Sequence, residues 1–227
     1  MMPWVGAIVP AAGRSERMAG MEKQFVPLGD RPLIAWCIDA LERSPVVVAV
    51  VVAVSEQRMS TMTALSRERR WKKTTFVTGG ERRQDSVASA LKALMAVDWV
   101  LVHDGDRPFL DERLIVEGIR AAEQTGVAVA AVPVTDTIKV VNEAGAVLAT
   151  PTRDSLRAVQ TPQVLRADIM REAYVGVQET ATDDAMLAER LGYAVQVYPG
   201  SGENIKVTVP YDLVIAEAIA RRRLGWR

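Results

Sequence analysis

The sequence has one cysteine and one histidine among its 227 residues. Cys37 by itself cannot form a disulfide within the chain, and its apolar neighbours predict a buried, inert thiol. His103 has no second histidine or cysteine with which to share zinc, so we expect a packed residue at a strand end. The N-terminus also lacks a basic stretch followed by an apolar signal segment, and together these features predict a cytoplasmic protein.

An excess of charge of either sign is also missing. The 28 lysines and arginines balance 28 aspartates and glutamates. No overall field therefore favours nucleic acid or an anionic membrane, and any anion site must be local. The longest apolar run, residues 46–54, is too short to cross a bilayer. We therefore expect neither nucleic acid nor a membrane as a partner.

Two widespread phosphate-binding motifs do not occur. The absence of Gly-x-x-x-x-Gly-Lys-Ser/Thr excludes the phosphate loop of ATPases and GTPases. The residues after Gly13 lack the second and third glycines of the dinucleotide fingerprint. The second strand candidate ends in Ser55-Glu56, well beyond the ~20-residue spacing expected for an acid that binds a ribose. A dinucleotide-dependent oxidoreductase is therefore disfavoured.

Segments with strand and helix patterns alternate along most of the chain. The strand candidates are the segments 5–9, 46–54, 74–77, 99–103, 127–132 and 194–198. Several are continuous apolar runs, which are typical of parallel strands covered on both faces. The alternation predicts an α/β fold with a doubly wound, mostly parallel sheet, formed by residues 1–227 as a single domain.

Residues 135–148 interrupt this alternation. Two short strand patterns flank residues 142–145, Asn-Glu-Ala-Gly, which have the composition of a tight turn. A lone two-stranded ribbon is marginal in water and needs a surface to pack on. That surface is either a partner subunit or the chain's own domain, and the sequence leaves both open.

The segment after the first strand candidate has the composition of an anion site. Residues 10–13 are Pro-Ala-Ala-Gly, and the following turn carries Arg14 and Arg17, with Lys23 shortly after. Small residues let a flat ring or a phosphate approach the backbone, while turn amides and cations favour an anion. The segment predicts a nucleoside triphosphate pocket; the alternative is an ordinary strand-to-helix turn with exposed arginines.

Two further clusters follow strand candidates. Asp104 comes directly after the strand candidate 99–103. A carboxylate there suits Mg²⁺, because this ion needs only one or two protein carboxylates beside a triphosphate. The alternative is an aspartate that caps a helix or forms a salt bridge. The glycines 79–80 and Ser86 have the pattern of a turn and helix start, which offers amides and a hydroxyl to a base. Ligands of open α/β sheets bind outside the carboxyl ends of the strands, so these clusters are expected at one edge. Lys206, between β-branched residues, points either inward to a phosphate or outward to solvent.

Taken together and in order, these segments resemble one family. The motifs are Pro10-Ala-Ala-Gly, Lys23-Gln24, Gly79-Gly80, Asp85-Ser86-Val87, Val102-His103-Asp104, Asp136-Thr137-Ile138-Lys139, Thr161-Pro162-Gln163, Thr182-Asp183 and Asn204-Ile205-Lys206-Val207-Thr208. Over about residues 5–220 the chain resembles the 2-C-methyl-D-erythritol 4-phosphate cytidylyltransferases of the sugar-nucleotidyltransferase-like superfamily. The resemblance implies a Rossmann-like nucleotidyltransferase fold and a homodimer formed through a β-ribbon arm at about residues 134–154.

The resemblance also implies roles for individual residues. The CTP site is expected at Ala11, Ala12 and Gly13, with Gly80, Glu81 and Ser86 around the cytosine. Arg17, Lys23 and Lys206 are the expected catalytic cations, and Asp104 is the expected ligand of Mg²⁺. The second substrate is expected to contact Gly105, Arg107, Thr161 and Lys206, while Thr137 and Arg153 are expected to reach the sugar-phosphate site of the neighbouring subunit.

The activity that the resemblance implies is transfer of CMP from CTP to 2-C-methyl-D-erythritol 4-phosphate. The products are 4-diphosphocytidyl-2-C-methyl-D-erythritol and pyrophosphate, in the non-mevalonate synthesis of isoprenoid precursors. Two alternatives stay open. One is ribitol 5-phosphate as the acceptor, and the other is a nucleotide-binding homologue that does not catalyse.

Two positions depart from the pattern usual in this family. Ser15 stands where glycine is common, and Gly105-Asp106 replaces Ala-Ala before the arginine. In an extended stretch, Asp104 and Asp106 lie on one face. Asp106 then has three candidate roles: joining the metal site, pairing with Arg107, or repelling the incoming phosphate.

Overall fold

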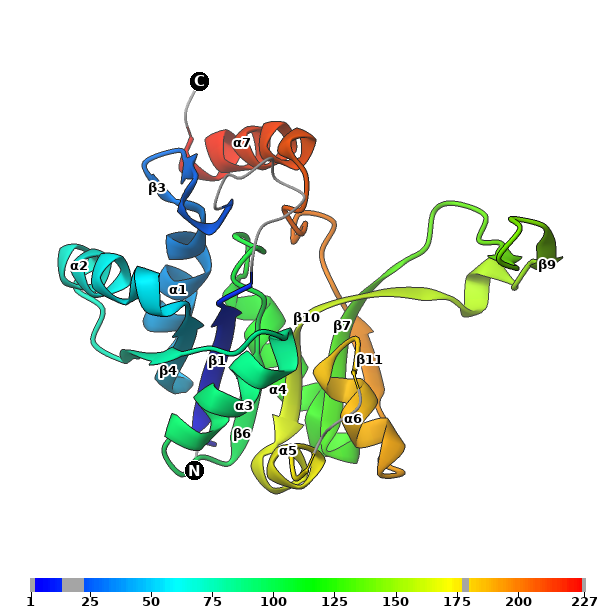
Figure 1. Cartoon of the computed structure of the whole chain (residues 1–227), viewed down its shortest axis with the longest axis horizontal. Coiled ribbons are helices and arrows are strands. Elements are labelled where there is room, and N and C mark those ends of the chain that lie inside the picture. Colours follow the sequence, from blue (N-terminus) through cyan, green and yellow to red (C-terminus); the bar gives the residue numbers. More distant parts are fainter. Residues whose placement is uncertain (1–2, 14–22, 177–179, 226–227) are drawn as a thin grey trace.

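The computed structural model describes residues 3–13, 23–176 and 180–225 (Figure 1). Its centre is a seven-stranded sheet in the order β11-β7-β10-β6-β1-β4-β5. The strands are β1 (Val5–Ala11), β4 (Val47–Val54), β5 (Thr74–Thr78), β6 (Trp99–Val102), β7 (Val127–Pro133), β10 (Arg157–Arg166) and β11 (Gln196–Pro199). Neighbouring strands are parallel except where β10 is involved, so the expected mostly parallel sheet is confirmed.

Helices cover both faces of this sheet. On one face lie α1 (Leu33–Arg43), α2 (Met59–Arg69) and α4 (Glu112–Thr125); on the other lie α3 (Arg83–Ala93), α5 (Ala167–Ala173) and α6 (Asp184–Arg190). In β1, Ala7 and Val9 belong to the first apolar core and Ile8 to the second, because successive side chains of a strand point to opposite faces. Burial on both faces explains the continuous apolar runs of the sequence.

β10 is a strand that the sequence pattern did not indicate. It lies between β6 and β7 and is antiparallel to both. Its sequence contains Pro162, which has no N–H for a ladder, and several polar side chains, and such a stretch argues against a central strand. The pairing with β7 shifts register between Val159 and Gln163, so the proline falls where the ladder is interrupted.

The last helix closes the end of the molecule near the carboxyl edge of the sheet. Ala216 and Ala220 of α7 (Pro210–Leu224) pack with Leu28 and Trp36. Leu28 belongs to the short hairpin of β2 (Pro27–Leu28) and β3 (Arg31–Pro32), which Figure 1 shows beside α7. The short helix η2 (Lys23–Phe25) precedes this hairpin, and η3 (Glu56–Arg58) precedes α2.

No helix in the described part of the chain is long and apolar enough to cross a membrane.

A two-stranded ribbon projects from the body between β7 and β10 (Figure 1). Its antiparallel strands are β8 (Val140–Val141) and β9 (Val147–Ala149), and the short helix η4 (Arg153–Ser155) leads back to β10. The expected ribbon is therefore present. It does not fold back on its own domain, and its apolar side chains are exposed, Leu148 at 66%.

Candidate active site

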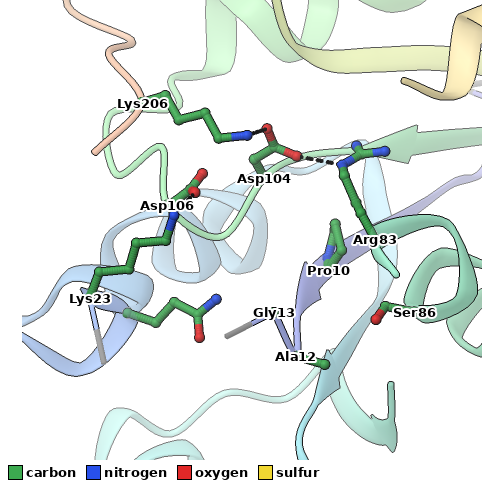
Figure 2. Close-up of a pocket in the computed structure, with 10 residues that line it drawn as sticks. Pro10, Ala12, Gly13, Lys23, Arg83, Ser86, Asp104, Asp106 and Lys206 are labelled. Atoms are coloured by element: carbon green, nitrogen blue, oxygen red, sulfur yellow. Dashed lines mark hydrogen bonds and ion pairs between the residues drawn. The ribbon is translucent and has the colours of Figure 1, made fainter. Parts of the chain in front are cut away.

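A pocket of about 250 Å³ opens at the carboxyl edge of the sheet (Figure 2). It lies beyond the ends of β1 and β6, beside the start of α3. The residues that line it are Pro10, Ala12, Gly13, Lys23, Gln24, Arg83, Ser86, Asp104, Asp106 and Lys206. Residues expected from the sequence to bind a nucleotide and its metal therefore lie around one cavity, and the expectation of a shared edge is confirmed.

One wall of the pocket is made of small residues. A Cβ atom at Gly79 would lie 2.4 Å from Cβ of Ala12 and 2.7 Å from Oγ of Ser86, so only glycine fits between the ends of β5 and β1. The amide of Gly80 donates to Oγ of Ser86 at 3.2 Å. These contacts hold the start of α3 against the end of β1 and leave backbone near Gly13 accessible to a flat ring.

The other wall carries three cations held by two carboxylates. Nζ of Lys23 lies 2.5 Å from Oδ2 of Asp106, and Nζ of Lys206 lies 2.9 Å from Oδ2 of Asp104. Nε of Arg83 lies 3.0 Å from Oδ1 of Asp104 (Figure 2). The two lysines come from opposite ends of the chain, so only the fold brings them to the same loop after β6. Such a concentration of positive charge attracts a polyphosphate.

Asp104 is ionised in this setting. Burial by itself would raise the pKa of Asp104, but the charges of Arg83 and Lys206 outweigh burial and hold that pKa well below the usual range. The carboxylate therefore carries one negative charge between these two cations at neutral pH, which leaves a net positive charge among the three groups. A polyanion that enters the pocket competes with Asp104 for them.

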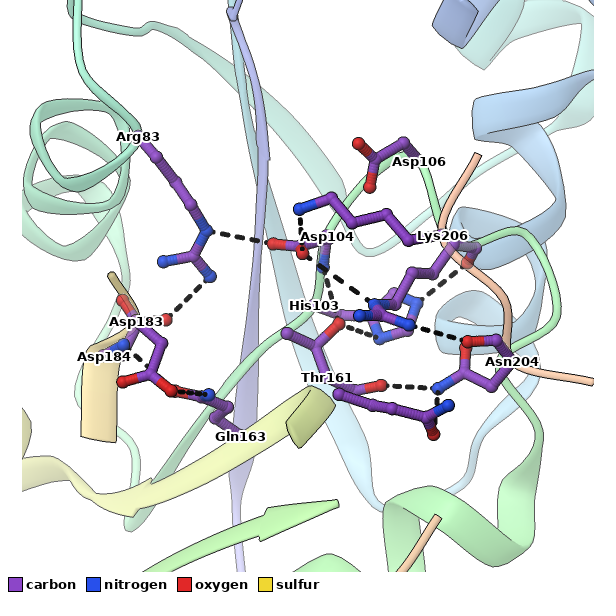
Figure 3. Close-up of polar contacts among 12 residues, drawn as sticks. Arg83, His103, Asp104, Asp106, Thr161, Gln163, Asp183, Asp184, Asn204 and Lys206 are labelled. Carbon is purple, nitrogen blue, oxygen red and sulfur yellow. Dashed lines mark hydrogen bonds and ion pairs between the residues drawn. The ribbon is translucent and has the colours of Figure 1, made fainter. Parts of the chain in front are cut away.

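Arg83 is a site residue that the sequence analysis missed. Besides Asp104, its Nη2 reaches Oδ2 of the fully buried Asp184 at 2.8 Å (Figure 3). The hydroxyl of Tyr174 donates to the other oxygen of Asp184 at 2.5 Å. Burial would lower the pKa of Arg83, but the two aspartates raise it, so the guanidinium stays charged. The available signal was its place in the first helical turn after the two glycines, beside Ser86.

His103 is buried and has a structural role, as expected. Its Nε2 donates to the carbonyl of Arg107 at 2.9 Å, and its Nδ1 accepts from Oγ1 of Thr161 at 3.2 Å. These two partners favour one neutral tautomer. Oγ1 of Thr161 in turn accepts from the amide of Asp104 at 3.0 Å, so the histidine supports the loop that carries the site carboxylate. Burial lowers the pKa of His103 to about 4.

The segment 200–208, between β11 and α7, is fastened to the same loop. Nη1 of Arg107 donates to the carbonyl of Asn204 at 2.8 Å, and Nδ2 of Asn204 donates to the carbonyl of Thr161 at 2.6 Å (Figure 3). The amide of Val207 donates at 2.9 Å to a carbonyl of the loop after β6. These bonds place the lysine of this segment at the pocket.

Some of the residues expected to contact the substrates lie close to the pocket without lining it. Ala11 is buried within β1, and Gly105 packs against it, since a Cβ there would lie 3.4 Å from Cβ of Ala11. Glu81 is exposed on the turn before α3. Arg107, in the loop after β6, donates to the carbonyl of Asn204, and Thr161, in β10, accepts from the amide of Asp104.

Other expected site residues are not brought to this pocket. Thr137 and Arg153 lie on the arm, which extends away from the body of the chain (Figure 1), and Nη1 of Arg153 donates to the carbonyl of Thr135 at 3.1 Å. Arg17 and Ser15 lie outside the described residues.

The carboxylates of the pocket fit a magnesium ion that arrives with a nucleotide. Among the described residues, no group of three or more His, Cys, Asp or Glu side chains forms a metal centre. However, Asp104 and Asp106 both line the pocket, and Oδ1 of Asp106 is buried with no hydrogen-bond partner among the described residues. Mg²⁺ needs only one or two protein carboxylates when phosphates and water supply the other ligands.

The fold and the pocket together define a class of protein. A mostly parallel sheet covered on both faces carries, at its carboxyl edge, a wall of small residues next to a cluster of cations. This is the arrangement of an α/β nucleotidyltransferase-like protein.

Comparison with known proteins identifies the family. A family model described as 2-C-methyl-D-erythritol 4-phosphate cytidylyltransferase matches residues 5–222. A protein of that name from Dehalococcoides mccartyi is 45% identical over 219 residues, which cover 96% of each chain. The chain therefore belongs to the 2-C-methyl-D-erythritol 4-phosphate cytidylyltransferase family, as its motifs predicted.

Solved structures agree with this assignment. The crystal structure of 4-diphosphocytidyl-2C-methyl-D-erythritol synthase from Anaerococcus prevotii has a TM-score of 0.87 at 27% identity and covers 97% of both chains. The crystal structure of 2-C-methyl-D-erythritol 4-phosphate cytidylyltransferase from Thermus thermophilus has a TM-score of 0.78 at 34% identity. That match covers 97% of this chain and 100% of the Thermus chain. The expected nucleotidyltransferase fold is thus confirmed.

Proposed function

We propose that this protein transfers CMP from CTP to 2-C-methyl-D-erythritol 4-phosphate, giving 4-diphosphocytidyl-2-C-methyl-D-erythritol and pyrophosphate in the non-mevalonate synthesis of isoprenoid precursors. Family membership supports the reaction. The observation that carries the proposal is the convergence of Lys23, Arg83 and Lys206, from three distant parts of the chain, on one pocket with a wall of small residues.

The chemistry assigned to the pocket is mainly electrostatic. A phosphate oxygen of the acceptor attacks the α-phosphorus of CTP in line, the bond from that phosphorus to the bridging oxygen breaks, and pyrophosphate leaves. The acceptor phosphate is already ionised near neutral pH, so no general base is required. Two polyanions must meet, and neutralising and positioning them lowers the barrier. Lys23, Arg17 and Lys206 are assigned to this task.

The base and sugar of CTP are assigned to the small-residue side of the pocket. Ala12, Gly13 and Ser86 line it, and we extend the site to Ala11, Gly80 and Glu81 next to them. Backbone amides and one hydroxyl suit the polar edge of a pyrimidine.

Magnesium is proposed as the cofactor, with Asp104 as its protein ligand. Without a bound nucleotide, the two oxygens of Asp104 pair with Arg83 and Lys206. A role as a metal ligand therefore requires that the triphosphate bind these two cations in place of the carboxylate. When bound, the ion supplies further neutralisation of phosphate charge. Asp104 then serves to hold the metal on the side of the pocket where the lysines lie.

The acceptor is assigned to the loop after β6. Gly105 and Arg107 belong to this loop, near Lys206, and Thr161 of β10 accepts a hydrogen bond from the amide of Asp104 in the same loop. We propose that Thr137 and Arg153 complete the acceptor site of a neighbouring subunit, since the arm carries them away from their own pocket.

A homodimer through the arm is part of this proposal. Val140, Val141, Val147 and Leu148 are exposed on a two-stranded ribbon, which is marginal in water without a packing surface, and Ile138 is exposed just before it. We expect Leu148→Asp to shift the protein from dimer to monomer in sedimentation velocity. Leu191→Asp, an exposed leucine at the end of α6, should leave the dimer intact. A wild-type monomer would refute the arm's role.

We also propose that residues 1–227 form one domain with the arm as an appendage, and that the protein is cytoplasmic. The continuous seven-stranded sheet supports the first statement. The single, buried cysteine supports the second, because extracellular proteins often rely on disulfides.

The deciding experiment is a pyrophosphate-release assay with purified protein and Mg²⁺. CTP should support turnover with 2-C-methyl-D-erythritol 4-phosphate, and ATP, GTP and UTP should support little. Ribitol 5-phosphate serves as the competing acceptor. Faster turnover with ribitol 5-phosphate would change the assigned substrate, and CTP binding without turnover of either acceptor would refute the enzymatic function.

A further inference from the structure

The two carboxylate oxygens of Asp106 are in different settings. Its Oδ2 lies 2.5 Å from Nζ of Lys23, while its Oδ1 is buried and has no hydrogen-bond partner in the described part of the chain. The residue is only 7% exposed and lines the pocket. A buried carboxylate in this position is costly unless it is paired, and in the described part of the chain Lys23 is its one charged partner within direct contact.

The same carboxylate is the anchor for the lysine. Lys23 directly follows residues 14–22 and begins η2, and its ammonium group meets a residue 83 positions later in the sequence. A lysine side chain is flexible and loses rotamer entropy when its ammonium group is held in one place. The short, charge-assisted bond to Asp106 offsets part of that entropy and keeps the ammonium group at the pocket.

The loop after β6 also holds Lys206 through an ion pair with an aspartate. Asp104 binds Lys206 at 2.9 Å, and the carbonyl of Asp106 accepts from the amide of Val207 at 2.9 Å. Each of the two lysines is therefore paired with an aspartate of this loop, and Asp104 and Asp106 are two residues apart. Asp104 has a second cation, Arg83, whereas Lys23 is the one ion-pair partner of Asp106 among the residues that the structure describes.

We propose that Asp106 is a positioning residue that keeps Lys23 in the pocket until the triphosphate takes it over, a role that rests on the proposed cytidylyltransferase function. The carboxylate has two opposed effects. It orders the lysine before the nucleotide arrives, which favours the reaction step. It also competes with the phosphates for the same ammonium group, which weakens binding of CTP in the ground state.

The test is Asp106→Asn, which keeps the shape of the side chain and removes its charge. Because a neutral amide holds an ammonium group less firmly than a carboxylate does, we expect kcat with saturating substrates to fall about tenfold. The KM for CTP should stay unchanged or decrease, because the competing charge is gone. Asp30→Asn, which removes an exposed partner of Arg31 outside the pocket, is the matched control and should change neither constant.

A double-mutant cycle separates positioning from a general structural effect. If Asp106 acts through Lys23, adding Asp106→Asn to Lys23→Ala should cost no further activity. An additional loss of about tenfold in the double variant would overturn the proposal. So would recovery of kcat at high Mg²⁺ in Asp106→Asn, because that result assigns the residue to the metal instead.

A second readout does not depend on turnover. Brief acetylation with acetic anhydride, followed by mass spectrometry, should label Lys23 more slowly than the exposed Lys92 in the wild type, and faster in Asp106→Asn. Equal labelling of Lys23 in both proteins would refute its tethering. If the wild type fails to turn over CTP with any acceptor, the proposed function fails, and the labelling result still decides whether Asp106 holds the lysine.

Discussion

Nη2 of Arg83 lies 2.8 Å from Oδ2 of Asp184, and this pair joins the pocket to the protein interior behind it. Asp184 has no exposed surface and is the first residue of α6. Its amide donates to Oε1 of Gln163 at 3.0 Å, so the carboxylate is fixed from β10 as well. Since Arg83 also binds Asp104, a residue outside the pocket helps to position the proposed metal ligand.

We expect Asp184→Asn to lower the free energy of unfolding by about 2 kcal/mol, because it leaves a largely buried arginine with one carboxylate fewer. Activity should fall too, since Arg83 is no longer held beside Asp104. Urea unfolding measures the first effect. Glu117→Gln, which removes an exposed partner of Arg113, is the control and should change stability by less than ~0.5 kcal/mol. Equal effects of the two variants would contradict a special role of the buried pair.

Lys206→Ala should separate catalysis from stability. The side chain is 38% exposed, and Asp104 keeps Arg83 as a partner when the lysine is removed, so the melting temperature should change little. Loss of a cation that stabilises transition-state charge should lower kcat by a factor of about 100 to 1,000. Lys92→Ala, at an exposed position of α3, should retain full activity. Near-normal turnover of Lys206→Ala at saturating CTP would remove it from the catalytic set.

Gly79→Ala should disturb the wall of the pocket that is made of small residues. The new methyl group would lie 2.4 Å from Cβ of Ala12, so the ends of β5 and β1 must separate. We expect a loss of about 1–3 kcal/mol in stability, as for other overpacked sites, and a higher KM for CTP. Gly202→Ala is the matched control, because nothing lies within 4 Å of a Cβ atom there. An unchanged KM with lower stability would place the glycine in folding rather than in CTP binding.

His103 should make stability depend on pH in a defined window. The unfolded chain protonates this imidazole near its ordinary pKa of 6.5, whereas burial lowers the folded pKa of His103 to about 4. The unfolded state therefore binds more protons between these values, and stability is complete above pH 6.5 and is lost as the pH falls toward 4. Between pH 7 and pH 5 we expect a loss of about 1–2 kcal/mol from this residue.

The single histidine makes that expectation easy to check by NMR. The carbon-bound imidazole protons of the folded protein should show no titration between pH 8 and pH 5, because Nε2 donates to Arg107 and Nδ1 accepts from Thr161 in the neutral form. A midpoint near pH 6.5 in the folded protein would contradict the buried, neutral assignment.

Much of the sheet could be predicted because its strands carry a local signal. β1, β4 and β6 are apolar on both faces, and that pattern is visible in a few consecutive residues. β10 carries no such signal, since Pro162 and its polar neighbours are tolerated only through the register shift against β7. Partners far apart in the sequence, rather than local preference, make this segment a central strand.

The same distinction applies to the site. Ala12, Gly13 and Asp104 could be predicted because they follow strands whose ends meet at one edge. Arg83 was missed despite its place after the two glycines, because its contacts with two carboxylates, one of them 101 residues away, are not visible in the local sequence.

The sequence by itself determined the fold class, the edge of the sheet that carries the pocket and the family, because strand patterns and motif spacings are local properties of the chain. Only the tertiary structure decided that Asp106 pairs with Lys23 rather than with Arg107, and that Arg83 joins Asp104 to Asp184. The physical reason is range: a charge pairs with whichever opposite charge the fold brings within about 3–4 Å, and separation along the chain does not predict that distance.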